Sequence, residues 1–236
     1  YPQTKTVEYL KTDKGVYRVA NLDRRIFAPN FLTHYKIQTV EGYDPLYLKN
    51  YAEFITLLER RKPDLSPPYG FNRIVTVSNY DSSLFDFLNV KYVLSLNEIS
   101  SPKLKKVFTE GETKMYQNIS AFDRAFFVRE IVPSTENIAS EILSTNLKEI
   151  AIVEGISQGK ELVVGKVIIT SYKENSIQLN TYNSGQGFLV ISDSYYPTWS
   201  AYVDGAKTKI YRTNNAFRGI FVPEGNHTIL FKDSLL

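Results

Sequence analysis

The sequence contains no cysteine, which excludes disulfide bonds and thiolate metal ligands. Its two histidines, His34 and His227, lie far apart and neither has a partner at a spacing typical of a zinc site. The motifs of P-loops, dinucleotide-binding turns, hydrolase nucleophile elbows and zinc proteases are also missing from the chain. We therefore expect neither a metal nor a cofactor.

Long apolar runs are missing as well. No stretch approaches the roughly 18 consecutive apolar residues of a membrane-spanning helix, and no signal peptide opens the chain. The sequence begins Tyr-Pro-Gln-Thr without a methionine. We interpret it as a fragment or a processed part of a longer protein.

Charge of one sign does not dominate either. The formal net charge is +3, and the longest basic run is Arg60-Arg61-Lys62. Proteins that bind nucleic acid by neutralising phosphates carry dense basic patches or recognisable motifs, and this sequence has neither. We expect no nucleic-acid partner.

Aromatic residues are abundant, with 17 Tyr and 14 Phe among 236 residues, and they favour strands. A hydrophobic fraction of 43% and a charged fraction of 22% are typical of a globular protein. The length allows one large domain or two ordinary ones.

The first 120 residues read as a mixed α/β domain, with helices between strands. Hydrophobic periodicity and turn residues predict the elements there. Asp44 is a plausible N-cap for a helix that starts at Pro45, and Asp81-Ser82-Ser83 caps a second helix. The predicted helices are residues 6–11, 45–58 and 84–88; the predicted strands are 16–20, 74–78, 91–96 and a hairpin around Glu110-Gly111-Glu112.

Residues 121–236 change character. After a strand over 124–131 and a helix over 134–143, short strands alternate with turns such as Asp204-Gly205, a type I′ signal. This spacing predicts an antiparallel β-sandwich that resembles a jelly roll, and the whole chain is then α+β. The predicted strands are 150–153, 165–173, 176–182, 187–193, 200–203, 207–212, 217–222 and 227–231.

Two stretches of the sequence resemble a known family. The run Ser-Asp-Ser-Tyr-Tyr-Pro-Thr-Trp-Ser-Ala-Tyr-Val-Asp-Gly over 192–205, followed by 210–219 and 222–227, resembles the C-terminal region of the YfhO-like bacterial membrane proteins. Upstream, Glu-Gly-Tyr-Asp-Pro-Leu-Tyr over 41–47 is similar to that family too. The chain departs from the pattern at Thr198, where Gly is expected, and at Asp123, where Pro is expected.

The resemblance implies a multi-spanning protein similar to membrane-embedded C-type glycosyltransferases, which use lipid-phosphate-linked sugars to modify cell-envelope polymers such as teichoic acids. Their catalytic carboxylate sits in an early extracytoplasmic loop that this chain lacks. The chain would then face the outside of the membrane, with its own membrane helices as partners and one of them following Leu236. We expect no catalytic residue in this chain.

Candidate glycan-binding residues follow from side-chain chemistry. Tyr195, Tyr196 and Tyr202 offer aromatic faces to sugar rings, although alternation along the strand places the neighbouring Trp199 in the core. A polar group, Arg212, Asn214 and Arg218, surrounds a turn and could bind phosphate or glycan, or could brace the loop. Asp44 is the remaining candidate, with capping as its alternative role.

The sequence leaves three alternative functions open. The first is an accessory region of a membrane glycosyltransferase that orients or binds a cell-envelope glycan acceptor. The second is a free-standing carbohydrate-binding or adhesion module without catalysis, which rests on fold analogy. The third is a glycosidase that draws its acids from Glu41, Asp44 or Asp193.

Overall fold

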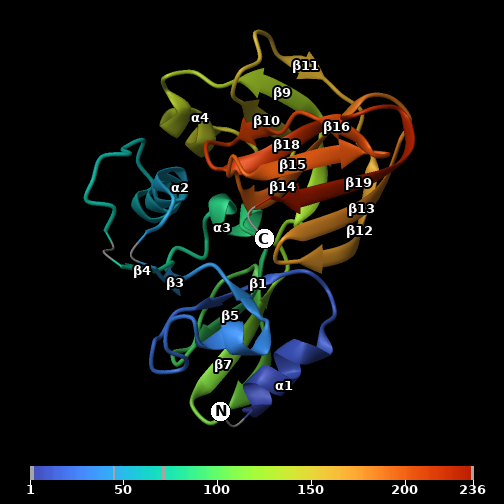
Figure 1. Cartoon of the computed structure of the whole chain (residues 1–236). Coiled ribbons are helices and arrows are strands. Elements are labelled where there is room, and N and C mark those ends of the chain that lie inside the picture. Colours follow the sequence, from blue (N-terminus) through green and yellow to red (C-terminus); the bar gives the residue numbers. More distant parts are fainter. Residues whose placement is uncertain (1–2, 45, 71–72, 235–236) are drawn as a thin grey trace. The chain divides into compact units, whose positions relative to one another are not determined.

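The computed structural model describes residues 3–44, 46–70 and 73–234 (Figure 1). The chain divides into two compact units, residues 1–123 and residues 124–236. No helix in the described ranges combines the length and the apolar character that crossing a bilayer requires.

The N-terminal unit is built on a mixed five-stranded sheet in the order β2-β1-β5-β7-β6. Strand β1 runs parallel to both β2 and β5, whereas β7 runs antiparallel to β5 and β6. The short strands β3 and β4 pair separately. The bounds are β1 (Arg18–Asn21), β2 (Gln38–Thr39), β3 (Gly42–Tyr43), β4 (Ile74–Val75), β5 (Val90–Ser95), β6 (Leu104–Glu110) and β7 (Thr113–Asn118).

Helix α1 (Lys5–Thr12) starts where the Thr4 hydroxyl accepts a hydrogen bond from the Val7 amide, and it buries Val7 and Leu10 in a core shared with β1, β5 and β7. Helix α3 (Ser83–Phe87) is capped by Ser82, as predicted. A 3₁₀ helix, Phe31–Tyr35, and helix α2 (Lys49–Arg60) complete the unit.

The predicted start of α2 is wrong. The helix begins at Lys49 with Leu48 at its N-cap position, and no side chain caps it. Asp44 instead accepts a hydrogen bond from the Leu46 amide at 2.8 Å, so its carboxylate closes a local turn ahead of the helix. Pro45 lies outside the described residues.

The C-terminal unit contains two sheets, in the orders β11-β9-β10-β17-β18-β14-β8 and β12-β13-β19-β15-β16 (Figure 1). Their facing apolar side chains form one core, which includes Phe127, Ile191, Leu179 and Phe231. The first sheet contains β8 (Ala125–Val128), β9 (Glu130–Pro133), β10 (Ile150–Val153), β11 (Lys160–Glu161), β14 (Gly187–Ser194), β17 (Tyr211–Thr213) and β18 (Phe217–Val222). The second contains β12 (Lys166–Lys173), β13 (Ser176–Asn183), β15 (Trp199–Val203), β16 (Ala206–Thr208) and β19 (Gly225–Asp233).

This architecture confirms the predicted α+β class with a β-sandwich. Strand β13 pairs with β19, and the next strand, β14, pairs with β18, the strand before β19. In this nested pairing, β13 and β14 lie in opposite sheets, as do β18 and β19, which resembles part of a jelly roll.

Three predicted elements of this unit need correction. The single strand over 124–131 is two strands, because the chain turns at Arg129 and β8 pairs with β14 while β9 runs parallel to β10. The strand over 207–212 is also two, since β16 and β17 belong to different sheets. The helix predicted from Ser134 begins later, as α4 (Ile138–Ser144). Thr135 precedes this helix, and its hydroxyl donates a hydrogen bond to the carboxylate of Glu141 within it.

Candidate functional site

A hollow on the face of the second sheet that points away from the sandwich core brings together an aromatic ring and several polar side chains. Tyr202 of β15, Leu230 of β19 and Gln178 of β13 lie in one row across three hydrogen-bonded strands. Their positions alternate with core residues such as Ala201 and Ile229, which is why they face outward. Asp204, Gly205, Thr228 and Lys232 complete the lining.

The turn after β15 shapes one side of this hollow. Asp204 and Gly205 have φ values of 50° and 83°, as the predicted type I′ turn requires. The Asp204 carboxylate accepts a hydrogen bond from the Thr228 amide at 2.8 Å and contacts His227 Nδ1 at 2.6 Å. The hydrogen bond to His227 lowers the pKa of Asp204 and raises the pKa of His227. Asp204 therefore holds the hairpin to β19.

A second cluster surrounds the turn between β17 and β18. The guanidinium of Arg212 lies 5.2 Å from the centre of the Tyr195 ring, and Arg212 also pairs with Glu154 at 3.1 Å. The buried Arg218 lies 3.8 Å from the centre of the Trp199 ring and donates a hydrogen bond to the Ser194 carbonyl. These contacts hold the loop between β14 and β15 against the turn.

Asn214 is part of the fold at this turn. It is fully buried and has a positive φ of 49°. Its backbone N–H donates a hydrogen bond to the Ile152 carbonyl at 2.7 Å, and its side-chain oxygen accepts one from the Ile152 backbone N–H at 2.9 Å. Asn214 thus continues the sheet beside β10 and leaves its side chain no access to solvent.

The structure therefore separates the seven candidate residues. Tyr195, Arg212, Asn214 and Arg218 gather around the β17–β18 turn, whereas Tyr202 lies on the other sheet, in the hollow. Tyr196 follows Tyr195 in the loop with 42% of its surface exposed. Asp44 belongs to the N-terminal unit and is exposed. Trp199 packs against the sandwich core, as predicted.

Sequence reasoning missed a hydrogen-bonded group of an arginine, an aspartate and a tyrosine inside the sandwich. Arg124 is 1% exposed, and its Nη1 lies 2.8 Å from Asp193 and 2.7 Å from the Tyr172 hydroxyl. Tyr172 also donates to Asp193 at 2.8 Å. Asp193 lies two positions after the apolar run 188–191 of a predicted buried strand. A buried acid requires a cation, and that signal could have found Arg124. Asp193, one of the acids considered for a glycosidase, is committed to this ion pair.

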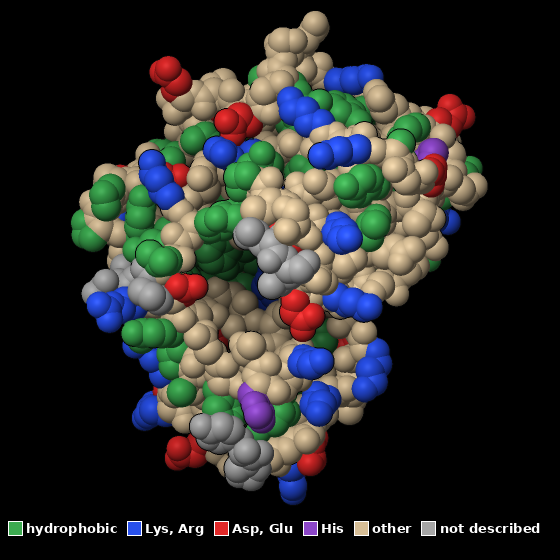
Figure 2. Space-filling model, viewed as in Figure 1, with side chains coloured by type: hydrophobic (Ala, Val, Ile, Leu, Met, Phe, Trp, Pro, Cys, Tyr) green, Lys and Arg blue, Asp and Glu red, His purple; other side chains and the backbone are tan. Residues whose placement is uncertain are grey.

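On the face of the molecule that Figure 2 shows, the charges of the described residues do not gather into one patch. On the face shown in Figure 2, the described Lys and Arg side chains are scattered among acidic and apolar ones. Within the described part of the chain, no group of three or more His, Asp or Glu residues could hold a metal ion.

In the comparison with known proteins, one family model matches part of the chain. The model of the family described as "Bacterial membrane protein YfhO" matches residues 160–232, which run from β11 to β19. The match confirms the predicted YfhO-like resemblance over this segment. No curated protein and no solved structure matches the chain.

Proposed function

We propose that this chain, YfhO-like over residues 160–232, is the extracytoplasmic region of a polytopic bacterial membrane protein, and that its C-terminal unit binds an acceptor glycan of the cell envelope in the Tyr202 hollow. The parent protein would be similar to glycosyltransferases that use lipid-linked sugars, with catalysis in its membrane part. The observation that carries the proposal is that all seven residues lining the hollow lie within the segment that matches the family.

The chemistry of the hollow suits a polyhydroxylated ligand. The Tyr202 ring and the Leu230 side chain form an apolar floor on which the C–H face of a sugar can rest. Gln178 offers both donors and acceptors, and Thr228 offers a hydroxyl, so both can exchange hydrogen bonds with sugar hydroxyls. Lys232 adds a cation that favours a polymer carrying phosphate, as teichoic acids do.

Binding and orientation fit these residues better than bond cleavage does. A glycoside-cleaving site needs two carboxyl groups that face one substrate. The hollow contains a single acid, Asp204, and both oxygens of its carboxylate hold the hairpin. We therefore assign the hollow a role in holding the acceptor.

The test is calorimetric titration of the purified chain with teichoic acid and with peptidoglycan fragments. Tyr202→Ala removes the aromatic floor, and we expect it to weaken binding at least about tenfold, or 1.4 kcal/mol. Tyr196→Ala is the matched control, because Tyr196 is an exposed tyrosine of the same unit outside the hollow. It should leave the affinity unchanged.

Two results would contradict the proposal. If no envelope polymer produces heat with the intact chain, the hollow does not bind glycans. If Tyr196→Ala weakens binding and Tyr202→Ala does not, the ligand binds at the loop after β14 instead.

A further inference from the structure

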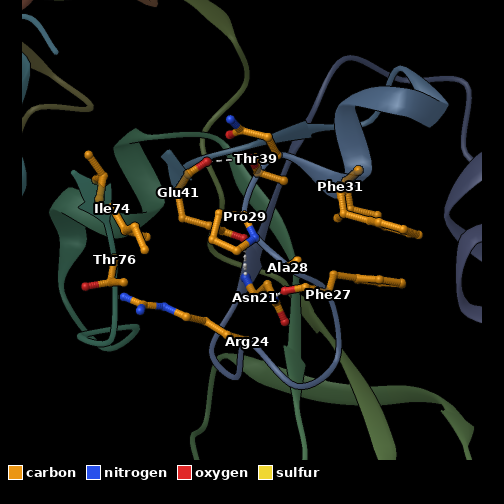
Figure 3. A pocket seen from close by; sticks show the side chains of 13 residues that line it. Asn21, Arg24, Phe27, Ala28, Pro29, Phe31, Thr39, Glu41, Ile74 and Thr76 are labelled. Carbon is orange, nitrogen blue, oxygen red and sulfur yellow. Dashed lines mark hydrogen bonds between the residues drawn. The ribbon is translucent and has the colours of Figure 1, made fainter. Parts of the chain in front are cut away.

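A second pocket lies in the N-terminal unit and has no role in the function proposed above. It is formed by the end of β1, the loop that follows it, the residues between β2 and β3, and strand β4 (Figure 3). Its walls are largely apolar and include Phe27, Pro29, Phe31 and Val75. The polar residues of its lining are Asn21, Arg24, Asn30, Thr39, Glu41 and Thr76.

Glu41 turns its carboxylate inward, toward the backbone of Asn21 (Figure 3). Its Oε1 accepts a hydrogen bond from the Asn21 amide at 2.9 Å. Among the described residues, no cation lies within ion-pairing distance of this carboxylate. Burial therefore raises the pKa of Glu41 from its usual 4.5 to about 7.

Asn21 presents a second acceptor. Its Nδ2 donates to the Phe27 carbonyl at 2.8 Å, which fixes the orientation of the amide. The Oδ1 atom is buried and has no hydrogen-bond donor among the described residues. A buried acceptor without a donor is costly in free energy, so a group that donates a hydrogen bond to Oδ1 is favoured here.

The inner space of the pocket has a volume of about 20 Å³, enough for one group of the size of a water molecule. Arg24, which is exposed, lines the pocket as well, and its side chain extends alongside Thr76 (Figure 3). Its neighbour Arg25 is held by Asp23 at 2.6 Å, whereas Arg24 has no ion-pair partner in the described parts of the chain. The pocket thus combines acceptors inside with a cation at its exposed side.

We propose that this pocket binds a small zwitterion, whose primary ammonium group contacts the Glu41 carboxylate and Asn21 Oδ1 while its anionic group pairs with Arg24. An ammonium group carries three donors and no acceptor, so it can satisfy both oxygens at once. A hydroxyl group has a single donor and can satisfy only one of them. The ammonium group is close in size to a water molecule. The guanidinium of an arginine binds carboxylate or phosphate through two parallel N–H groups.

The experiment is an NMR titration of the intact chain at pH 8 with β-alanine and, as a matched comparison, 3-hydroxypropionate. The two molecules share a carboxylate and differ in an ammonium against a hydroxyl head. We expect β-alanine to produce saturable shifts at the Asn21 backbone and side-chain amides, with at least about tenfold tighter binding than 3-hydroxypropionate. Equal binding of the two, or no saturable shift with either, would overturn the proposal.

Variants locate the two ends of the ligand. Glu41→Gln keeps the shape but removes the charge, and it should weaken β-alanine binding at least about tenfold. Arg24→Gln should weaken it too, whereas Arg25→Gln, at the next position but outside the pocket, should not. Arg24 and Arg25 are both exposed, so these two variants test the site even if Glu41→Gln fails to fold.

The pH dependence of β-alanine binding gives an independent test of the role of Glu41. Arg24 is the only other charged residue that lines the pocket among those described, and it stays protonated throughout. Neither probe titrates between pH 6 and pH 8, so β-alanine binding should weaken as the pH falls through about 7 and Glu41 takes up a proton. An affinity that does not change with pH would contradict the role of Glu41.

Discussion

The two units of the protein treat a carboxylate that is withdrawn from solvent, fully or in part, in different ways. In the C-terminal unit, Asp193 is 6% exposed and is held by the guanidinium of Arg124 and the hydroxyl of Tyr172. In the N-terminal unit, Glu41 receives one backbone hydrogen bond and meets no cation among the described residues. Asp86 shows that this unit can also pair a buried acid, because Lys103 lies 2.6 Å away.

The difference distinguishes a charge that the fold neutralises from a charge that the proposed ligand would neutralise. A buried ion pair with its hydrogen bonds satisfied is neutralised by the protein itself, and losing one partner leaves the other charge stranded. A half-buried carboxylate beside a small cavity and an amide oxygen without a donor is not neutralised by the described residues. The first arrangement stabilises the fold, and the second suits a ligand from outside.

The largest effect is expected at the paired carboxylate. Asp193→Asn removes the negative charge and leaves Arg124 buried without its counter-ion, so we expect a loss of about 3–5 kcal/mol in the free energy of unfolding. Urea denaturation of the intact chain measures it. The control is Glu149→Gln, which breaks the exposed pair with Arg129 and should cost only a small fraction of that loss. Similar losses in the two variants would remove the distinction between buried and surface pairs here.

At Glu41 we expect a smaller effect that depends on pH. Its folded-state pKa of about 7 lies above the usual 4.5, so the folded protein binds the proton more tightly than the unfolded chain. The stability that this group contributes is fully present below about pH 4.5 and is lost as the pH rises through 7. The loss is on the order of 2 kcal/mol, reduced by the partial exposure of the side chain.

Denaturation midpoints of the wild type and of Glu41→Gln between pH 5 and pH 8 give the measurement. The variant should lack this decline, because glutamine does not titrate. Parallel curves for the two proteins would show that Glu41 is already ionised at low pH, and the contrast with Asp193 would disappear.

The smallest effect concerns a carboxylate at the surface. Asp204 pairs with His227 and raises the pKa of that histidine above 6.5. This pair contributes stability below about pH 6.5 while Asp204 stays ionised, and that stability is lost as the pH rises through the folded pKa of His227. NMR titration of the ring protons should show the pKa of His227 falling toward 6.5 in Asp204→Asn. An unchanged pKa would contradict the hydrogen bond between the two side chains.

Local patterns predicted much of the secondary structure. The Ser82 cap, the Asp204-Gly205 turn and the alternation that buries Trp199 each depend on a few neighbouring residues, and the structure confirms them. The prediction at Asp44 failed because an aspartate closes a local turn as readily as it caps a helix. The strand over 124–131 was predicted as one because both halves alternate alike, although they pair with different partners.

The sequence by itself determined the α+β class, the sandwich of short strands and the YfhO-like resemblance, since periodicity, turn residues and an ordered motif are all local signals. Only the tertiary structure decided which side chains meet. It placed Asn214 inside the sheet, joined Arg124 to Asp193 across 69 positions, and separated Tyr202 from the arginines near it in sequence. It also brought Glu41 beside Asn21, because β1 and β2 pair in parallel and return the chain to the same end of the sheet. Contacts of this kind depend on strand order and register, which a single sequence does not specify.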